Sequence, residues 1–211
     1  MNANPLPAPA TSESEPEIFA RQGYLIIRGL IDPALAGYFW SYAHTRFASL
    51  QLSSGDSLVP NTPAGYGDPA FEGLLEHLRP RVGTACGMRL FPTYSYFRLY
   101  KKGDVLKRHS DRPACEISVS LNVGQEPSEP WPLFIEGPAG PAGTLLTPGD
   151  ALVYRGIEHP HWRDRFEGAR LVQVFLHYVD ADGPHADQKF DKRPGLMAPR
   201  GGGAQDDRAV S

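Results

Sequence analysis

The spacing of apolar residues predicts two amphipathic helices in the first half of the chain. Over residues 32–47 and 68–86, apolar side chains recur every three or four positions, which places them on one helical face. Each segment begins with an Asp-Pro pair, at Asp32 and at Asp68, which is typical of an N-cap followed by proline in the first turn. We expect the apolar faces of both helices to pack in the core.

A shorter helix and a buried strand are expected before them. Residues 15–22 favour a helix and are followed by Gly23, a residue type that commonly ends helices. The next four residues, 24–27, read Tyr-Leu-Ile-Ile. A continuous apolar run of this length predicts a buried strand.

From Leu90 onward the period of the pattern becomes two. Between residues 115 and 123, apolar side chains alternate strictly with polar ones, so the two faces of this strand should meet different environments. Further strand-like segments follow, separated by turns: 131–136, 144–147, 151–154 and 170–179. Many short strands after two helices predict a mainly β fold with flanking helices, in which a cupin-like jelly-roll barrel carries helices against one sheet.

Composition indicates a single globular domain. The chain has 211 residues, of which 41% are hydrophobic and 21% charged, as is ordinary for a globular protein. Residues 1–15 are rich in Pro, Ala, Ser and Glu, and residues 194–211 are rich in glycine. We therefore predict disordered tails at 1–15 and 194–211 around one domain at 16–193.

Charge and targeting signals narrow the range of partners. The net charge of −3 gives no general attraction to a phosphate backbone, which disfavours nucleic acid. The first residues lack the regions of a secretory signal, and no apolar run approaches the roughly 18 residues of a membrane span. The two cysteines, Cys86 and Cys115, lack the spacing of a metal knuckle or a disulfide framework. We expect a cytoplasmic protein with reduced thiols and no membrane partner.

Candidate chemistry centres on His109 and Asp111. Their spacing, His-x-Asp, lets a strand end or turn aim an imidazole and a carboxylate at one divalent metal. A facial triad of two histidines and one carboxylate needs a second histidine and open positions for co-substrate and oxygen. His159 and His161, which lie several predicted strands later, are the candidates for that histidine.

The residues around this pair match a longer pattern. The pattern is YxxGxxLxxHxD, formed here by Tyr100, Gly103, Leu106, His109 and Asp111. It resembles the Fe(II)- and 2-oxoglutarate-dependent oxygenases, particularly the prolyl 4-hydroxylase-like branch, over about residues 18–193. The resemblance implies a double-stranded β-helix, an Fe(II) ion held by His109, Asp111 and a distal histidine, and 2-oxoglutarate and O2 as co-substrates, with ascorbate in support.

The resemblance also suggests a choice between the two histidines. We favour His161, because Arg170 then follows nine positions later, similar to the spacing to the family's basic residue for 2-oxoglutarate. With His159 the gap is eleven, which also occurs in the family.

Two arginines compete for the distal carboxylate of 2-oxoglutarate, which a guanidinium pairs with well. Arg170 is the first candidate and Arg98 the second. Arg98 shares a strand face with Tyr94, Tyr96 and Tyr100. If that face points inward, Tyr100 matches the family position whose hydroxyl meets 2-oxoglutarate, and Arg98 binds either the co-substrate or a substrate carboxylate.

The predicted function is therefore a hydroxylase that releases succinate and CO2 while it oxidises an amino-acid-like, peptidyl or small-molecule substrate. Asp111 fits hydroxylation or desaturation, since related halogenases replace this carboxylate by a small residue. The alternative is a non-catalytic metal-binding jelly roll that acts as a sensor or interaction module. Residues 51–67 are long, polar and rich in turns, and we interpret them as a substrate loop or as a passive surface excursion. The sequence leaves the oligomeric state open.

Overall fold

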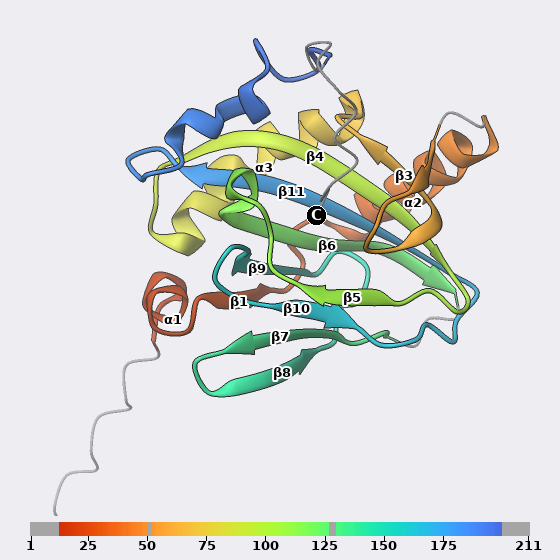
Figure 1. The fold of residues 1–211 in the computed structure, drawn as a ribbon, viewed down its shortest axis with the longest axis horizontal. Coiled ribbons are helices and arrows are strands. Elements are labelled where there is room, and N and C mark those ends of the chain that lie inside the picture. The colour runs from red at the N-terminus through yellow and green to blue at the C-terminus, as the bar shows by residue number, and fades with distance from the viewer. Residues whose placement is uncertain (1–12, 50–51, 127–129, 200–211) are drawn as a thin grey trace, which may run out of the picture.

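The computed structural model describes residues 13–49, 52–126 and 130–199 (Figure 1). In chain order the elements are α1 (Glu15–Gln22), β1 (Tyr24–Ile27), α2 (Pro33–Ala48), β2 (Ser53–Gly55), β3 (Pro60–Tyr66), α3 (Pro69–Cys86), β4 (Leu90–Lys101), β5 (Leu106–His109), η1 (Pro113–Cys115), β6 (Ile117–Glu126), β7 (Leu133–Gly137), β8 (Gly140–Thr144), β9 (Ala151–Arg155), β10 (His161–Arg163), β11 (Arg170–Asp180) and η2 (Ala186–Lys192).

The α-helices α1, α2 and α3 begin where the sequence predicts. The side chain of Asp32 accepts a hydrogen bond from the backbone N–H of Leu35, and that of Asp68 accepts one from Ala70, so both act as N-caps. Gly23 ends α1 in a left-handed conformation with φ of 76°, which glycine adopts without steric cost. None of the described helices is both long and apolar enough to cross a membrane.

Two antiparallel sheets face each other. The larger sheet has the strand order β1-β9-β6-β11-β4-β3-β2, and the smaller one has the order β5-β10-β7-β8. Helices α2 and α3 cover the outer face of the larger sheet, behind β4 and β11 in the view of Figure 1. The inner face of the larger sheet turns toward the smaller sheet, and the space between the sheets holds the second half of the core.

The alternation along the strands separates these two cores. In β6 the apolar residues Ile117, Val119 and Leu121 pack under the helices. The polar residues between them, Ser118 and Ser120, are buried too, because they face the interior between the sheets. The strict alternation therefore distinguishes an apolar core from a polar, buried interior, and both faces of the strand are buried over residues 117–124.

The segment after β11 packs back over the sheet. Arg193 is buried and pairs with Glu72 of α3, which also accepts a hydrogen bond from the backbone of Met197. Asp191 accepts hydrogen bonds from the Tyr66 hydroxyl at 2.6 Å and from Arg112 at 2.7 Å. This segment therefore ties α3 and β3 to the residue that follows Asp111.

Some boundaries differ from the predictions. Residues 1–12 and 200–211 of the predicted tails lie outside the described residues, whereas residues 194–199 pack against α3. The strand predicted at 144–147 is wrong in its bounds, because β8 ends at Thr144. Thr147 instead lies in a turn, where its backbone N–H and its hydroxyl both donate to the side chain of Asp150. The segment 51–67 is largely the β2–β3 hairpin, which extends the larger sheet at one edge.

Candidate metal centre

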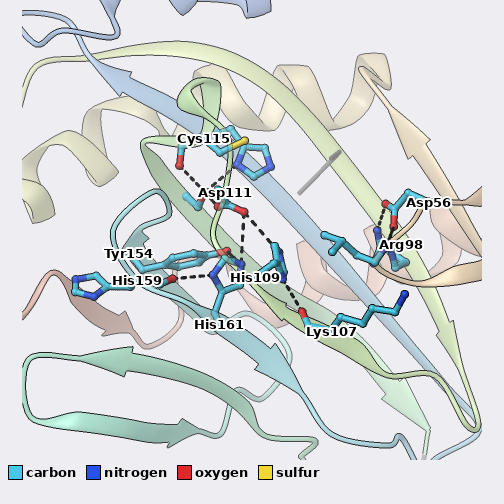
Figure 2. A network of polar contacts seen from close by, with 12 residues as sticks. Asp56, Arg98, Lys107, His109, Asp111, Cys115, Tyr154, His159 and His161 are labelled. Carbon is cyan, nitrogen blue, oxygen red and sulfur yellow. Dashed lines mark hydrogen bonds and ion pairs between the residues drawn. The ribbon is translucent and has the colours of Figure 1, made fainter. Parts of the chain in front are cut away.

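His109, Asp111 and His161 meet at one end of the space between the sheets. His109 is the last residue of β5 and His161 is the first of β10, and the two face each other directly in the antiparallel register. Oδ1 of Asp111 lies 3.7 Å from Nε2 of His109 and 3.5 Å from Nε2 of His161 (Figure 2). The ligand atoms of the three side chains all lie within 4.8 Å of one another, so a single ion can reach all of them.

Backbone carbonyl groups orient both imidazoles. Nδ1 of His109 lies 2.7 Å from the carbonyl oxygen of Lys107, and Nδ1 of His161 lies 3.0 Å from that of His159. A carbonyl oxygen only accepts, so each Nδ1 carries the proton and each Nε2 keeps its lone pair. This hydrogen bond from the second ring nitrogen is typical of histidines that bind a metal.

The carboxylate of Asp111 is held from one side and open on the other. Its Oδ2 atom accepts a hydrogen bond of 2.7 Å from the Ser118 hydroxyl, and its backbone N–H donates to the carbonyl oxygen of Gly156. Oδ1 of Asp111 and Nε2 of His109 are buried without a hydrogen-bond partner among the described residues. Such unpaired buried atoms are costly unless a ligand satisfies them, and both point toward the position a metal would take.

Gly156 allows the carboxylate to lie where it does. A Cβ atom at this position would lie 2.2 Å from Oδ2 of Asp111 and 2.4 Å from the carbonyl oxygen of Cys115. Any larger residue would therefore displace Asp111, and the glycine is required by close packing. The sequence analysis missed Gly156 and Ser118, because the turn after β9 and the strand β6 come to lie beside Asp111 only in the folded chain.

Burial sets the protonation of the three groups. It lowers the pKa of His109 and of His161 to about 4, so both rings are neutral at neutral pH, which is the form that binds metal. Burial also raises the pKa of Asp111 to about 6, against the opposing hydrogen bond from Ser118. A cation beside Asp111 would favour the carboxylate form.

Tyr154 contacts the same site. Its hydroxyl lies 3.3 Å from Nε2 of His161 and donates to it, since that nitrogen is unprotonated. One lone pair cannot serve both a proton donor and a metal, so this hydroxyl must find another acceptor when a metal binds.

A second group of possible ligands shares Asp111 with the first. It consists of Asp111, Cys115 and His177, and the Cys115 sulfur lies 3.0 Å from the Tyr94 hydroxyl. Burial raises the pKa of the Cys115 thiol well above its usual value. A neutral thiol is a poor ligand, so the group of His109, Asp111 and His161 is the better metal site.

His159 lies outside the group. Its Nδ1 atom lies 2.9 Å from the carbonyl oxygen of Glu136, and its ring packs edge-on against Tyr24. Its backbone carbonyl oxygen orients His161. Between the two candidates, the structure brings His161 to His109 and Asp111.

The structure does not bring Arg170 to this site. Arg170 is exposed at the start of β11, where it pairs in register with the exposed residues Lys101 and Glu126. It also shares a strand face with Val172 and Val174, which pack under the helices. The expectation that Arg170 reaches a co-substrate beside the metal ligands is therefore corrected.

Two other arginines do enter the interior. Arg98 lies on β4 and is fully buried, beside Tyr100 on the inner face of the larger sheet. Arg163, which the sequence analysis missed, lies two residues after His161 on β10 and is 2% exposed. It donates to the carbonyl oxygen of Trp131 and, at 3.0 Å, to the side chain of Gln173.

Arg163 has no carboxylate partner among the described residues, and burial lowers its pKa to about 10. A buried cation with only neutral acceptors is unfavourable without an anion. Tyr100 is also fully buried, and its hydroxyl meets no hydrogen-bond partner in the part of the chain that the structure describes. The charges of Arg98 and Arg163 both act on the pKa of Tyr100, against the effect of burial.

Comparison with solved structures identifies the fold. A prolyl-4-hydroxylase from Pseudomonas putida superposes with a TM-score of 0.61 at 18% identity, over 75% of this chain and 94% of that one. The non-heme alpha-ketoglutarate-dependent carbocyclase SnoK of nogalamycin biosynthesis gives 0.69 at 11% identity, over 92% and 94%. EctD from S. alaskensis, solved with 2-oxoglutarate and 5-hydroxyectoine, gives 0.64 at 13% identity, over 92% and 88%. This chain has the fold of the 2-oxoglutarate-dependent oxygenases.

The predicted double-stranded β-helix with flanking helices is thereby confirmed. The two facing sheets are its two walls, and the candidate metal centre lies between them. No protein-family model matches the chain, and no curated protein sequence does.

Proposed function

We propose that this protein is an Fe(II)- and 2-oxoglutarate-dependent dioxygenase that hydroxylates an organic substrate. The observation that carries the proposal is the group of His109, Asp111 and His161, whose lone pairs and unpaired carboxylate oxygen converge inside this fold. Two histidines and one carboxylate leave open positions on an iron for co-substrate and oxygen. Structures with this fold contain 2-oxoglutarate in EctD, and nickel and 2-oxoglutarate in HygX.

The three side chains would hold the iron, each in a defined role. His109 and His161 supply neutral nitrogens, and Asp111 supplies one negative charge. Bound Fe(II), with 2-oxoglutarate and O2, supplies the oxidation of a C–H bond with release of succinate and CO2. Lys107 and His159 fix the rings through their carbonyl groups, and Ser118 fixes the carboxylate.

Arg163 would bind the distal carboxylate of 2-oxoglutarate, in place of Arg170. It is a fixed, buried guanidinium that needs a counter-ion, and it shares a strand face with His161 because the two lie two residues apart. Tyr100 would donate its unpaired hydroxyl to the same carboxylate. Gln173 holds the guanidinium by accepting one of its hydrogen bonds, while Gln173 itself donates to Ser120.

Release of succinate from 2-oxoglutarate, with Fe(II) and ascorbate present, tests the proposal. We expect wild-type protein to form succinate without added substrate at a slow rate, and faster with a substrate. Protein that binds Fe(II) tightly but forms no succinate under any of these conditions would support the alternative, a metal-binding sensor or interaction module. A screen of amino acids, peptides and small metabolites for a 16 Da gain in mass would identify the substrate.

A further inference from the structure

Arg98 is a second arginine inside the barrel, and it differs from Arg163 in its partners. Its side chain is fully buried on the inner face of β4, opposite Gln173 of β11 in the register. Its Nη2 group donates to Oδ2 of Asp56, whereas Nε and Nη1 have no hydrogen-bond partner among the described residues. Two donor groups of a buried cation are therefore left for a ligand.

Asp56 holds the guanidinium in place from the β2–β3 hairpin. Its Oδ1 atom accepts from the backbone N–H groups of Leu58 and Val59, and its Oδ2 atom also accepts from the Tyr96 hydroxyl at 3.1 Å. Both oxygens of Asp56 are thus engaged within the protein. The carboxylate cannot leave without breaking this set of bonds, so Arg98 is fixed before any ligand arrives.

Aromatic rings restrict the guanidinium further. Its central carbon lies 5.4 Å from the ring centre of Tyr96 and 5.5 Å from that of Tyr100. Figure 2 shows the Arg98–Asp56 pair on the same side of Asp111 as His109, and the two tyrosines beside Arg98 belong to the core between the sheets. A group bound to Arg98 therefore lies in the same interior as the candidate metal centre.

One co-substrate needs only one of the two arginines. Arg163 lacks a carboxylate partner among the described residues and is the better match for 2-oxoglutarate. The charge of Arg98 is already balanced by Asp56, so its two unpaired donors call for a hydrogen-bond acceptor more than for a counter-ion. A neutral ion pair favours a singly charged carboxylate over a doubly charged phosphate, because the pair supplies no net charge to compensate the second one.

We propose that Arg98 binds a carboxylate of the substrate, so that the enzyme acts on small carboxylic acids such as free amino acids. This inference rests on the proposed oxygenase function. It implies that the reacting carbon is held near the iron by an acid group at one end of the molecule. It also disfavours residues inside a peptide chain, whose backbone carboxyl group is not free.

Matched acids and amides give the first test. Wild-type protein is assayed for substrate-stimulated succinate release with L-amino acids and small organic acids, and with the primary amide of each. We expect stimulation by acids and not by their amides. In Arg98→Gln, the half-saturating concentration of a stimulating acid should rise by roughly tenfold or more. The half-saturating concentration of 2-oxoglutarate should rise by a smaller factor in the same variant.

Three further variants are compared with Arg98→Gln. Arg163→Gln should raise the half-saturating concentration of 2-oxoglutarate by a larger factor than that of the acid. Arg165→Gln, at an exposed arginine, serves as the control. Arg98→Gln leaves Asp56 buried without a cation, so the neutral pair Asp56→Asn with Arg98→Gln is measured alongside. Equal stimulation by acids and amides would overturn the proposal, as would a larger effect of Arg98→Gln on 2-oxoglutarate than on the acid.

A direct binding measurement does not depend on finding the substrate. Zn(II)-loaded protein with N-oxalylglycine, a 2-oxoglutarate analogue that is not decarboxylated, is titrated with acetate while the side-chain Nε–H signals of arginine are followed by NMR. We expect the Arg98 signal to shift and saturate with acetate but not with acetamide. If the Arg98 signal shifts no more than the signals of exposed arginines such as Arg165, the proposal would be overturned. Failure of N-oxalylglycine to bind at all would instead overturn the proposed function.

Discussion

The hydroxyl group of Ser118 donates a hydrogen bond of 2.7 Å to Oδ2 of Asp111, from the neighbouring strand β6. The same hydroxyl lies 3.0 Å from Nδ1 of His177, so Asp111 is linked to β11 as well. A carboxylate that is held in this way presents its other oxygen, Oδ1, in one direction only. The orientation of the proposed metal ligand therefore depends on a residue that does not touch the metal.

We predict that Ser118→Ala weakens metal binding. Loss of a hydrogen bond that supports a metal ligand typically costs about 10- to 100-fold in affinity. Titration of metal-free protein with Co(II) would measure the change. Ser95→Ala is a suitable control, because the Ser95 hydroxyl is buried without a hydrogen-bond partner within residues 13–49, 52–126 and 130–199, and its loss should have little effect. Equal Co(II) affinities for Ser118→Ala and wild type would refute the supporting role.

We predict that His109→Ala, Asp111→Ala and His161→Ala each abolish iron binding or turnover. Each substitution removes one of three converging ligand atoms. His159→Ala should retain most of both, because the His159 ring bonds to Glu136 and only its backbone orients His161. Iron content after dialysis and succinate release would be compared. A fatal His159→Ala together with a mild His161→Ala would reverse the assignment of the distal ligand.

We predict that Arg163→Gln raises the half-saturating concentration of 2-oxoglutarate by roughly 10- to 100-fold. The substitution removes a charge-assisted bond, which contributes about 1.5 to 3 kcal/mol. Without co-substrate, the variant should unfold at no lower temperature than wild type, because it no longer buries an unpaired cation. Thermal unfolding with and without 2-oxoglutarate checks both points. Arg170→Gln is the control, and a larger effect there would return the role to Arg170.

We predict that Asp150 stabilises the fold above about pH 4 and loses this effect in acid. Burial alone would raise its pKa, but hydrogen bonds from Thr147, Gly29 and Arg28 lower it to about 2, from 3.8. Because the pKa is lower in the folded state, the contribution is lost as the pH falls from about 4 to 2. Asp150→Asn should cost roughly 2 kcal/mol at pH 7 and much less at pH 2.5. Urea unfolding at both values measures the difference, and a pH-independent cost would contradict it.

We predict that the segment 53–66 cannot be deleted without loss of the fold. Its strand β3 pairs with β4, and Val59, Thr62 and Ala64 are buried. Val59→Ala alone should lower the free energy of unfolding by roughly 2 kcal/mol. Val105→Ala, at an exposed position, should change it by less than about 0.5 kcal/mol. A folded deletion variant, judged by circular dichroism, would show the segment to be a passive excursion.

The sequence predicts the fold well because its signals are local. The N-caps at Asp32 and Asp68 and the period-two pattern of β6 depend only on neighbours along the chain, and the structure has the corresponding elements. The pair His109 and Asp111 was also visible, because it lies on one short segment. Ser118 and Gly156 were not, since their roles depend on which strands come to lie beside Asp111.

Arg170 shows where counting residues fails. The spacing from His161 to Arg170 suggested a shared site, but spacing along the chain does not say which face of a strand a side chain takes. Gln173 and His177 are odd-numbered polar residues in an otherwise apolar strand, and both face the interior. The even number of Arg170 therefore places it on the other face. By the same reasoning, Arg163 shares the inner face with His161.

The position of β11 in the larger sheet has a consequence for synthesis on the ribosome. This strand lies between β4 and β6, yet among the described strands it is the last to be made. Until it emerges, β4 and β6 each have one edge without its native neighbour, and such edges are prone to pair with other chains. Folding of the larger sheet must therefore wait until β11 has been made, and a nascent protein halted before Arg170 should depend on chaperones to stay unaggregated.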